Sequence, residues 1–72
     1  MDKEELISLG YKVSKAIGYN GQEFDAVQKR FEAEGKIPHW IVIDLDLVLQ
    51  NSDPVNYIEA EFAKAEKEYG KS

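Results

Sequence analysis

Three turn signals divide the chain of 72 residues into four segments of similar length. The signals are clusters rich in glycine, proline and asparagine, at residues 18–21, 35–38 and 51–54. Such clusters interrupt helices and strands. No element can then exceed 18 residues, so the fold must be built from short elements packed against one another.

The composition limits how such a fold can be stabilised. A chain of this length forms one domain and buries only about 60% of its unfolded surface. It has no cysteine, so neither disulfides nor a thiolate zinc site can supplement a small core. We expect residues 1–72 to form a single small helical domain that is stabilised by packing, helped by self-association.

The fourth segment has the clearest helix signal. Asp53 can cap the free amides of a first turn, and Pro54 at the first helical position has no amide to leave unpaired. Apolar residues then follow at spacings of three and four: Val55, Ile58, Phe62, Ala65 and Tyr69. The pattern predicts an amphipathic helix that starts at Pro54 and stops before Gly70.

The first two segments also show apolar residues at helical spacing. In the first they are Leu6, Gly10, Val13 and Ile17, and in the second Phe24, Val27 and Phe31. Gly18 and Gly35 follow where a helix tolerates positive φ, and Asn20 with Glu23 resembles a capping box. We expect helices over 3–17 and 21–34.

The third segment, residues 40–50, fits two periods. With period two, Ile41, Ile43 and Leu45 point one way, and with the helical period Ile41, Leu45 and Val48 share a face. A strand needs a partner, and no other segment shows a comparable alternation, so we favour a helix. The alternative is an α+β fold in which residues 40–50 form a strand that pairs between subunits.

These expectations combine into an all-α fold, a helical bundle of three to four helices. The expected core residues are Leu6, Leu9, Val13, Ile17, Phe24, Val27, Phe31, Ile41, Leu45, Val48, Ile58 and Phe62.

One short motif points to catalysis. Residues 41–52 resemble the first motif of the haloacid-dehalogenase superfamily, an apolar strand followed by Asp-x-Asp and a downstream serine. The resemblance implies a phosphatase or phosphotransferase in which Asp44 is the nucleophile and Asp46 the acid and base, beside magnesium. That family needs a doubly wound sheet and further motifs, and only 26 residues follow Asp46. We therefore interpret both aspartates as solvating an apolar segment.

Other catalytic signals are missing from the sequence. His39 is the single histidine, and there is no cysteine nucleophile. The glycines are dispersed and do not form a phosphate-binding loop. We expect no enzyme activity, no catalytic or cofactor-binding residues, no metal site and no cofactor.

The charge and the chain start limit the partners and the location. A net charge of −5 repels a phosphate backbone. A helix–turn–helix over 6–31 would place Glu23 and Asp25 at the bases, so nucleic acid is not expected as a partner. The acidic start is unlike a secretory signal, and acidic residues interrupt the most apolar stretch. We expect a cytoplasmic protein without a membrane span.

A second resemblance concerns the C-terminal half. Residues 44–45, 51–54, 57–58 and 62–65 are similar to small uncharacterised proteins of bacteriophages and prophages of Gram-positive bacteria. The resemblance implies an origin on a mobile element, and by analogy a stoichiometric inhibitor of one host or defence protein.

The expected function is therefore a non-enzymatic protein–protein interaction module. Residues 41–49 are too apolar to be covered by one small core, which indicates a protein partner or a homo-oligomer. The candidate partner-binding residues are large apolar or aromatic side chains: Trp40, Ile43, Leu47, Tyr57 and Tyr69.

Overall fold

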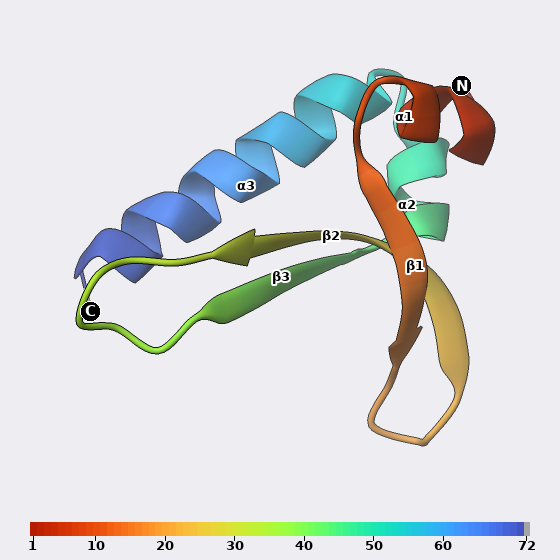
Figure 1. The fold of residues 1–72 in the computed structure, drawn as a ribbon. Helices are drawn as coiled ribbons and strands as arrows, with labels where there is room; N and C mark the ends of the chain where they lie inside the picture. Colours follow the sequence, from red (N-terminus) through yellow and green to blue (C-terminus); the bar gives the residue numbers. More distant parts are fainter. Residues whose placement is uncertain (72) are drawn as a thin grey trace.

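The structure is a computed structural model that describes residues 1–71, and it is an α+β fold (Figure 1). The elements in chain order are α1 (Lys3–Ser8), β1 (Lys12–Ile17), β2 (Glu23–Phe31), β3 (His39–Asp44), α2 (Leu45–Gln50) and α3 (Pro54–Lys71). The strands form an antiparallel sheet in the order β1-β2-β3. The prediction of an all-α helical bundle is therefore wrong.

The first predicted helix is confirmed only over α1. Gly10 adopts a φ of +100°, a conformation that glycine reaches without strain. The Tyr11 amide then donates to the Leu6 carbonyl, with an N to O distance of 3.1 Å. The chain thus leaves α1 in a tight turn and enters β1, where side chains alternate between two faces.

The second predicted helix is wrong, because its supposed cap belongs to a hairpin turn. The Gly18 amide donates to the Gln22 carbonyl at 2.9 Å, closing the β1–β2 hairpin. The Asn20 side chain accepts from the Gln22 amide at 3.1 Å instead of capping a helix. Because residues 23–31 form β2, the chain has no helix–turn–helix over 6–31.

The third segment changes from strand to helix at Asp44. β3 pairs antiparallel with β2, from Phe31 opposite His39 to Ala26 opposite Asp44. The Asp44 carboxylate then accepts from the Asp46 amide at 2.9 Å, which caps α2. The helix predicted over 40–50 is therefore wrong before Leu45. The strand partner comes from the same chain, not from another subunit.

The fourth helix is confirmed and forms most of the cover over the sheet. The Asp53 carboxylate accepts from the Asn56 amide at 3.2 Å, as expected of a cap. Gly70 does not end α3, which runs to Lys71. Near its end, the Tyr69 hydroxyl donates to the Ile37 carbonyl at 3.0 Å. This contact ties the end of α3 to the β2–β3 loop.

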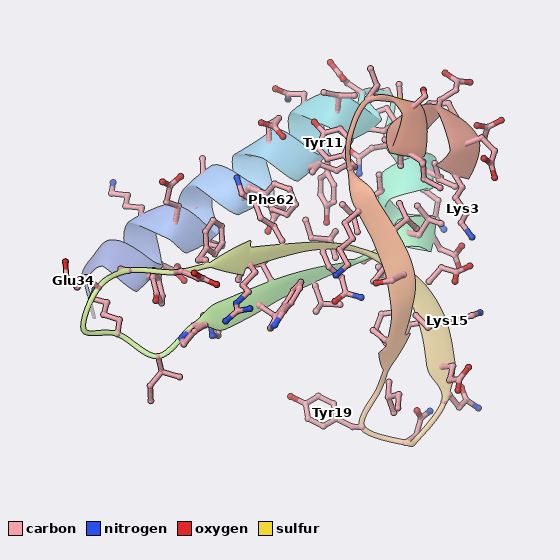
Figure 2. All side chains as sticks on the ribbon, in the orientation of Figure 1. Lys3, Tyr11, Lys15, Tyr19, Glu34 and Phe62 are labelled. Atoms are coloured by element: carbon pink, nitrogen blue, oxygen red, sulfur yellow. The ribbon has the colours of Figure 1, made fainter. Side chains whose placement is uncertain are left out.

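The core lies between α3 and one face of the sheet. Val13, Val27 and Ile43 are direct partners across the three strands and share this face. Phe62 projects from α3 toward β2 (Figure 2). The buried cluster consists of Leu6, Val27, Phe31, Ile43, Leu45, Val48, Ile58 and Phe62. Leu9 and Ile17, both predicted in the core, are 59% and 72% exposed.

Candidate functional site

The sheet has a second face, opposite the core, that no helix covers in the described part of the chain. Because side chains alternate along a strand, the register assigns this face its residues: Lys12, Ser14, Ala16, Phe24, Ala26, Gln28, Arg30, Trp40, Val42 and Asp44. We call it the open face. Trp40 is 43% exposed and Val42 is 44% exposed, so the open face presents large apolar groups to solvent.

One end of the open face is hollowed. The β1–β2 and β2–β3 hairpins extend in different directions (Figure 1), and Tyr19 projects into the angle between them (Figure 2). A hollow of about 590 Å³ lies there, lined by Ala16, Ile17, Gly18, Tyr19, Phe24 and Val42. Its lining is predominantly apolar, so it suits an apolar side chain of a partner.

The other end of the open face carries cations around Trp40. The Lys12 Nζ lies 4.6 Å from the centroid of the Trp40 ring, a cation–π contact. Arg30 is the direct partner of Trp40 across β2 and β3. The Arg30 Nε also lies 2.8 Å from the Glu32 Oε1, in an exposed ion pair. An aromatic ring flanked by two cations favours a partner that carries both apolar and acidic groups.

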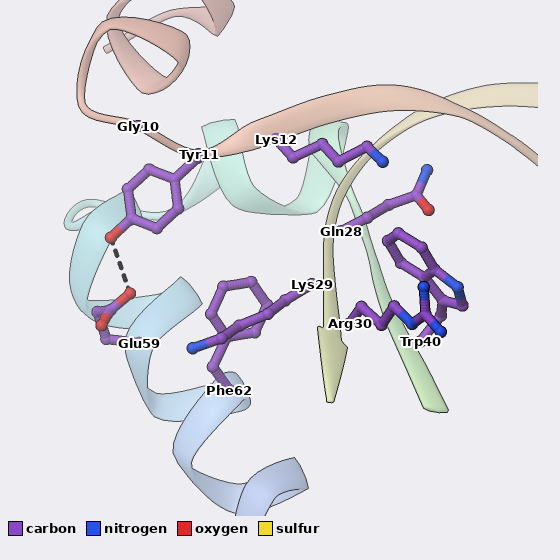
Figure 3. A pocket seen from close by; sticks show the side chains of 9 residues that line it. All are labelled: Gly10, Tyr11, Lys12, Gln28, Lys29, Arg30, Trp40, Glu59 and Phe62. Carbon is purple, nitrogen blue, oxygen red and sulfur yellow. Dashed lines mark hydrogen bonds between the residues drawn. The ribbon is translucent and has the colours of Figure 1, made fainter. Parts of the chain in front are cut away.

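A second hollow, of about 410 Å³, lies where β1 separates from β2 (Figure 3). We call it the notch. Its cations are Lys12, Lys29 and Arg30, and its aromatic rings are Tyr11, Trp40 and Phe62. The Lys29 Nζ lies 5.3 Å from the centroid of the Phe62 ring, on the core side of β2. The notch therefore carries cations on both sides of the strand.

Tyr11 and Glu59 form the wall of the notch that is nearest α3. The Tyr11 hydroxyl donates to the Glu59 Oε2 at 2.8 Å. Burial of the ring, together with the hydrogen bond to the Glu59 carboxylate and its charge, raises the pKa of Tyr11 above the ordinary 10.0. The bond joins the residue just before β1 to α3, and it occupies the one carboxylate that lines the notch.

Tyr11→Phe is expected to lower the free energy of unfolding at pH 7 by about 0.5–1.5 kcal/mol, through loss of this hydrogen bond. Folding raises the pKa of Tyr11. The stabilisation that the neutral Tyr11 hydroxyl gives to the folded state is therefore complete below pH 10, and it disappears as the pH rises through the folded-state pKa. Urea unfolding across this range should therefore show a smaller alkaline decline for Tyr11→Phe. The control Tyr19→Phe changes a fully exposed ring and should match the wild type. An equal alkaline decline in Tyr11→Phe would contradict the assignment.

The five candidate partner-binding residues lie in different environments. Trp40 lies on the open face, whereas Ile43 is buried in the core at 7% exposure. Tyr57 and Tyr69 are half-buried and pack against the core. Leu47 is 51% exposed on α2. The five residues therefore do not form a single surface in the structure.

The sequence interpretation missed the partners of Trp40 on the open face. Phe24 was predicted in the core, and Lys12 and Arg30 were given no role. The signal that could have found them is the period of two along the second segment, which places residues 24, 26, 28 and 30 on one face of a strand. Residues 40 and 42 lie on the same face of the neighbouring strand. This signal is weak because the apolar residues Phe24, Trp40 and Val42 lie on the open face, where an alternating pattern would carry polar ones.

The aspartates of the Asp-x-Asp motif have a structural role. Asp44 is the last residue of β3 and caps α2, and Asp46 lies exposed in the first turn of that helix. Within residues 1–71, no three side chains of the types His, Cys, Asp or Glu are grouped so that they could hold a metal ion.

Comparison of the chain with known protein families, curated proteins and solved structures finds no match. Over the same described residues, no helix combines the length and the apolar character needed to cross a membrane.

Proposed function

We propose that the protein is a non-enzymatic protein-interaction module that binds a protein partner through the open face. The observation that carries the proposal is an uncovered sheet face on which Trp40 and Val42 are 43% and 44% exposed, beside an apolar hollow. Interfaces are enriched in aromatic residues and arginine, and a few such residues supply most of the binding energy. Trp40, Phe24 and Arg30 are residues of this kind.

The size of the molecule supports the same proposal. Its accessible surface is 5283 Å² over the described residues, and a standard interface takes about 800 Å² from each partner. One interface would therefore occupy roughly 15% of the surface. The hollow beside the open face is lined by Gly18 and Tyr19 of the hairpin tip together with Phe24 and Val42, so one partner could contact both regions.

The proposal includes a biological role. By analogy with the small phage and prophage proteins that the sequence of the C-terminal half resembles, we propose a cytoplasmic inhibitor that binds one host or defence protein stoichiometrically. A module of 8.2 kDa can inhibit a larger protein by covering part of its surface. Binding through the open face would then block the contacts that the partner makes with other molecules. Pairing of two copies through the open face is the alternative.

The test is affinity capture from a bacterial lysate with matched variants. Trp40→Ala and Val42→Asp remove the apolar groups of the open face, and Leu47→Asp introduces the same charge on an exposed leucine of α2. We expect the wild type and Leu47→Asp to retain the same partner. Trp40→Ala should weaken its binding at least ~30-fold, the effect of a side chain worth about 2 kcal/mol.

Two controls make the result decisive. Circular dichroism should show that each variant is folded, and light scattering of the wild type should show a monomer. Capture that survives Trp40→Ala and Val42→Asp but fails with Leu47→Asp would overturn the assignment of the open face. Dimers in the absence of a partner would favour self-association instead.

A further inference from the structure

The central strand β2 extends beyond its neighbour β1. The last pair between them is Lys12 with Gln28, whereas β2 and β3 remain paired as far as Phe31 and His39. Residues 29–31 of β2 therefore have a strand on one side only. On the other side the chain turns away at Gly10, whose φ is +100°.

The notch lies at this unpaired edge. Figure 3 shows β2 passing through it, with Lys29 directed toward Phe62 on one side of the strand. Arg30 and Trp40 lie together on the other side. The hollow of about 410 Å³ thus occupies the position that a continuation of β1 would take.

The charge of the notch is opposite to that of the whole chain. Of the nine basic residues in a chain of net charge −5, Lys12, Lys29 and Arg30 line this one hollow. Its single carboxylate, Glu59, accepts the Tyr11 hydroxyl. The ion pair of Arg30 with Glu32 is exposed, and such pairs contribute at most about 1 kcal/mol. Arg30 can therefore exchange Glu32 for a carboxylate of a partner.

We propose that the notch binds a short, extended, acidic segment of the partner, which pairs with residues 29–31 of β2 in line with β1. The inference rests on the proposed function, because it specifies what the partner presents next to Trp40. Addition of a strand to a sheet edge supplies backbone hydrogen bonds, and side-chain contacts supply the specificity.

The geometry also determines the side-chain pattern of the segment. Successive side chains of a strand point to opposite faces. One set would meet Lys29 and Phe62, and the other set would meet Arg30 and Trp40. Both sides combine a cation with an aromatic ring, so the segment carries acidic side chains interspersed with apolar ones. Three residues of β2 span roughly 10 Å at about 3.3 Å each, so three to four residues of the partner fill the notch.

The experiment uses a defined peptide as the probe. An acetylated and amidated pentapeptide of sequence Glu-Glu-Val-Val-Glu, which places glutamate and valine on both faces of a strand, is titrated into the isotope-labelled full chain, and amide spectra are recorded by NMR. We expect the largest shifts at residues 29–31 and at the Trp40 indole. Those amides of residues 29–31 that point to the unpaired edge, and not those already bonded to β3, should also exchange more slowly with solvent. The same peptide with lysine in place of glutamate should bind at least ten-fold more weakly.

Variants with equal charge changes provide the control. The double variant Lys29→Glu with Arg30→Glu should weaken binding of the acidic peptide at least ten-fold. Lys64→Glu with Lys67→Glu changes two exposed lysines of α3 that do not line the notch, and should leave binding unchanged. Equal losses in both double variants would show only an effect of net charge and would overturn the proposal.

Two further outcomes also overturn it. One is the absence of shifts at residues 29–31 at millimolar acidic peptide. The other is tighter binding of an eight-nucleotide oligothymidylate with the same shifts, which would assign the notch to nucleic acid. If the peptide fails but Trp40→Ala still releases the captured protein, the notch is excluded and the proposed function stands. If Trp40→Ala does not release the captured protein, the proposed function fails, whatever the result with the peptide.

Discussion

Phe62→Ala is expected to remove most of the free energy of unfolding. The Phe62 side chain is 6% exposed and belongs to the cluster between α3 and the sheet. Truncation of a buried phenylalanine to alanine costs about 3–5 kcal/mol, because transferred area is lost and a cavity remains. A single core in a chain of this size rarely supplies more than about 3–5 kcal/mol. Urea unfolding followed by circular dichroism should show a largely unfolded variant at 25 °C.

The matched control is Phe24→Ala, which removes the same side chain from the open face. Phe24 is half-buried and lies outside the buried cluster, so its truncation should cost less than half as much as that of Phe62. Equal destabilisation by both variants would show that the open face is packed in solution. That result would contradict the arrangement of the sheet described above.

Leu6→Ala is expected to destabilise the protein by about 2–5 kcal/mol. Leu6 has no exposed surface and is the one buried residue of α1. A helix of six residues is not stable alone, so α1 depends on this contact. Hydrogen exchange should become fast over residues 3–9, and urea unfolding should shift to lower concentration.

Leu9→Ala tests whether position, and not residue type, determines this effect. Leu9 is 59% exposed, and substitutions at such surface positions usually change stability by less than about 0.5 kcal/mol. The sequence pattern assigned both leucines to the core, so the pair discriminates between the predicted long helix and the observed short one. A large loss in Leu9→Ala would favour the long helix.

The sequence predicted α3 because its signals are local. A cap at Asp53, a proline at the first position and apolar residues at a helical period all act within one element. Most of the buried cluster was also predicted, including Leu6, Val27 and Phe31. These large apolar residues are buried whether their segment forms a helix or a strand. Their burial could therefore be predicted without knowing which of the two the segment forms.

The strands were mispredicted because both faces of the sheet carry apolar residues. Val27 points to the core, but Phe24 and Ala26 on the open face obscure the alternation of β2. In residues 40–50 the period of two holds for the first half and the helical period for the second half, since the chain changes from strand to helix at Asp44. Pairing with β2 depends on residues far along the chain, which a local pattern does not contain.

The candidate site was partly predicted, since Trp40 was selected as a partner-binding residue. Ile43 was selected with it, but lies on the opposite face of the same strand. The cations of the notch come from β1 and β2, two segments that were assigned to helices. Their proximity follows from strand register, so it could not be inferred while the strands themselves were missed.

The distribution of the core along the chain determines when the protein can fold during synthesis. The strands pair with their neighbours in sequence, so the hairpins can form early. The inner face of the sheet, however, is covered by Ile58 and Phe62 of α3, the last of the described elements to leave the ribosome. Until then Val27, Phe31 and Ile43 stay exposed on the nascent chain, and exposed apolar strands promote aggregation. Stable folding is therefore a late event, completed only when α3 has emerged.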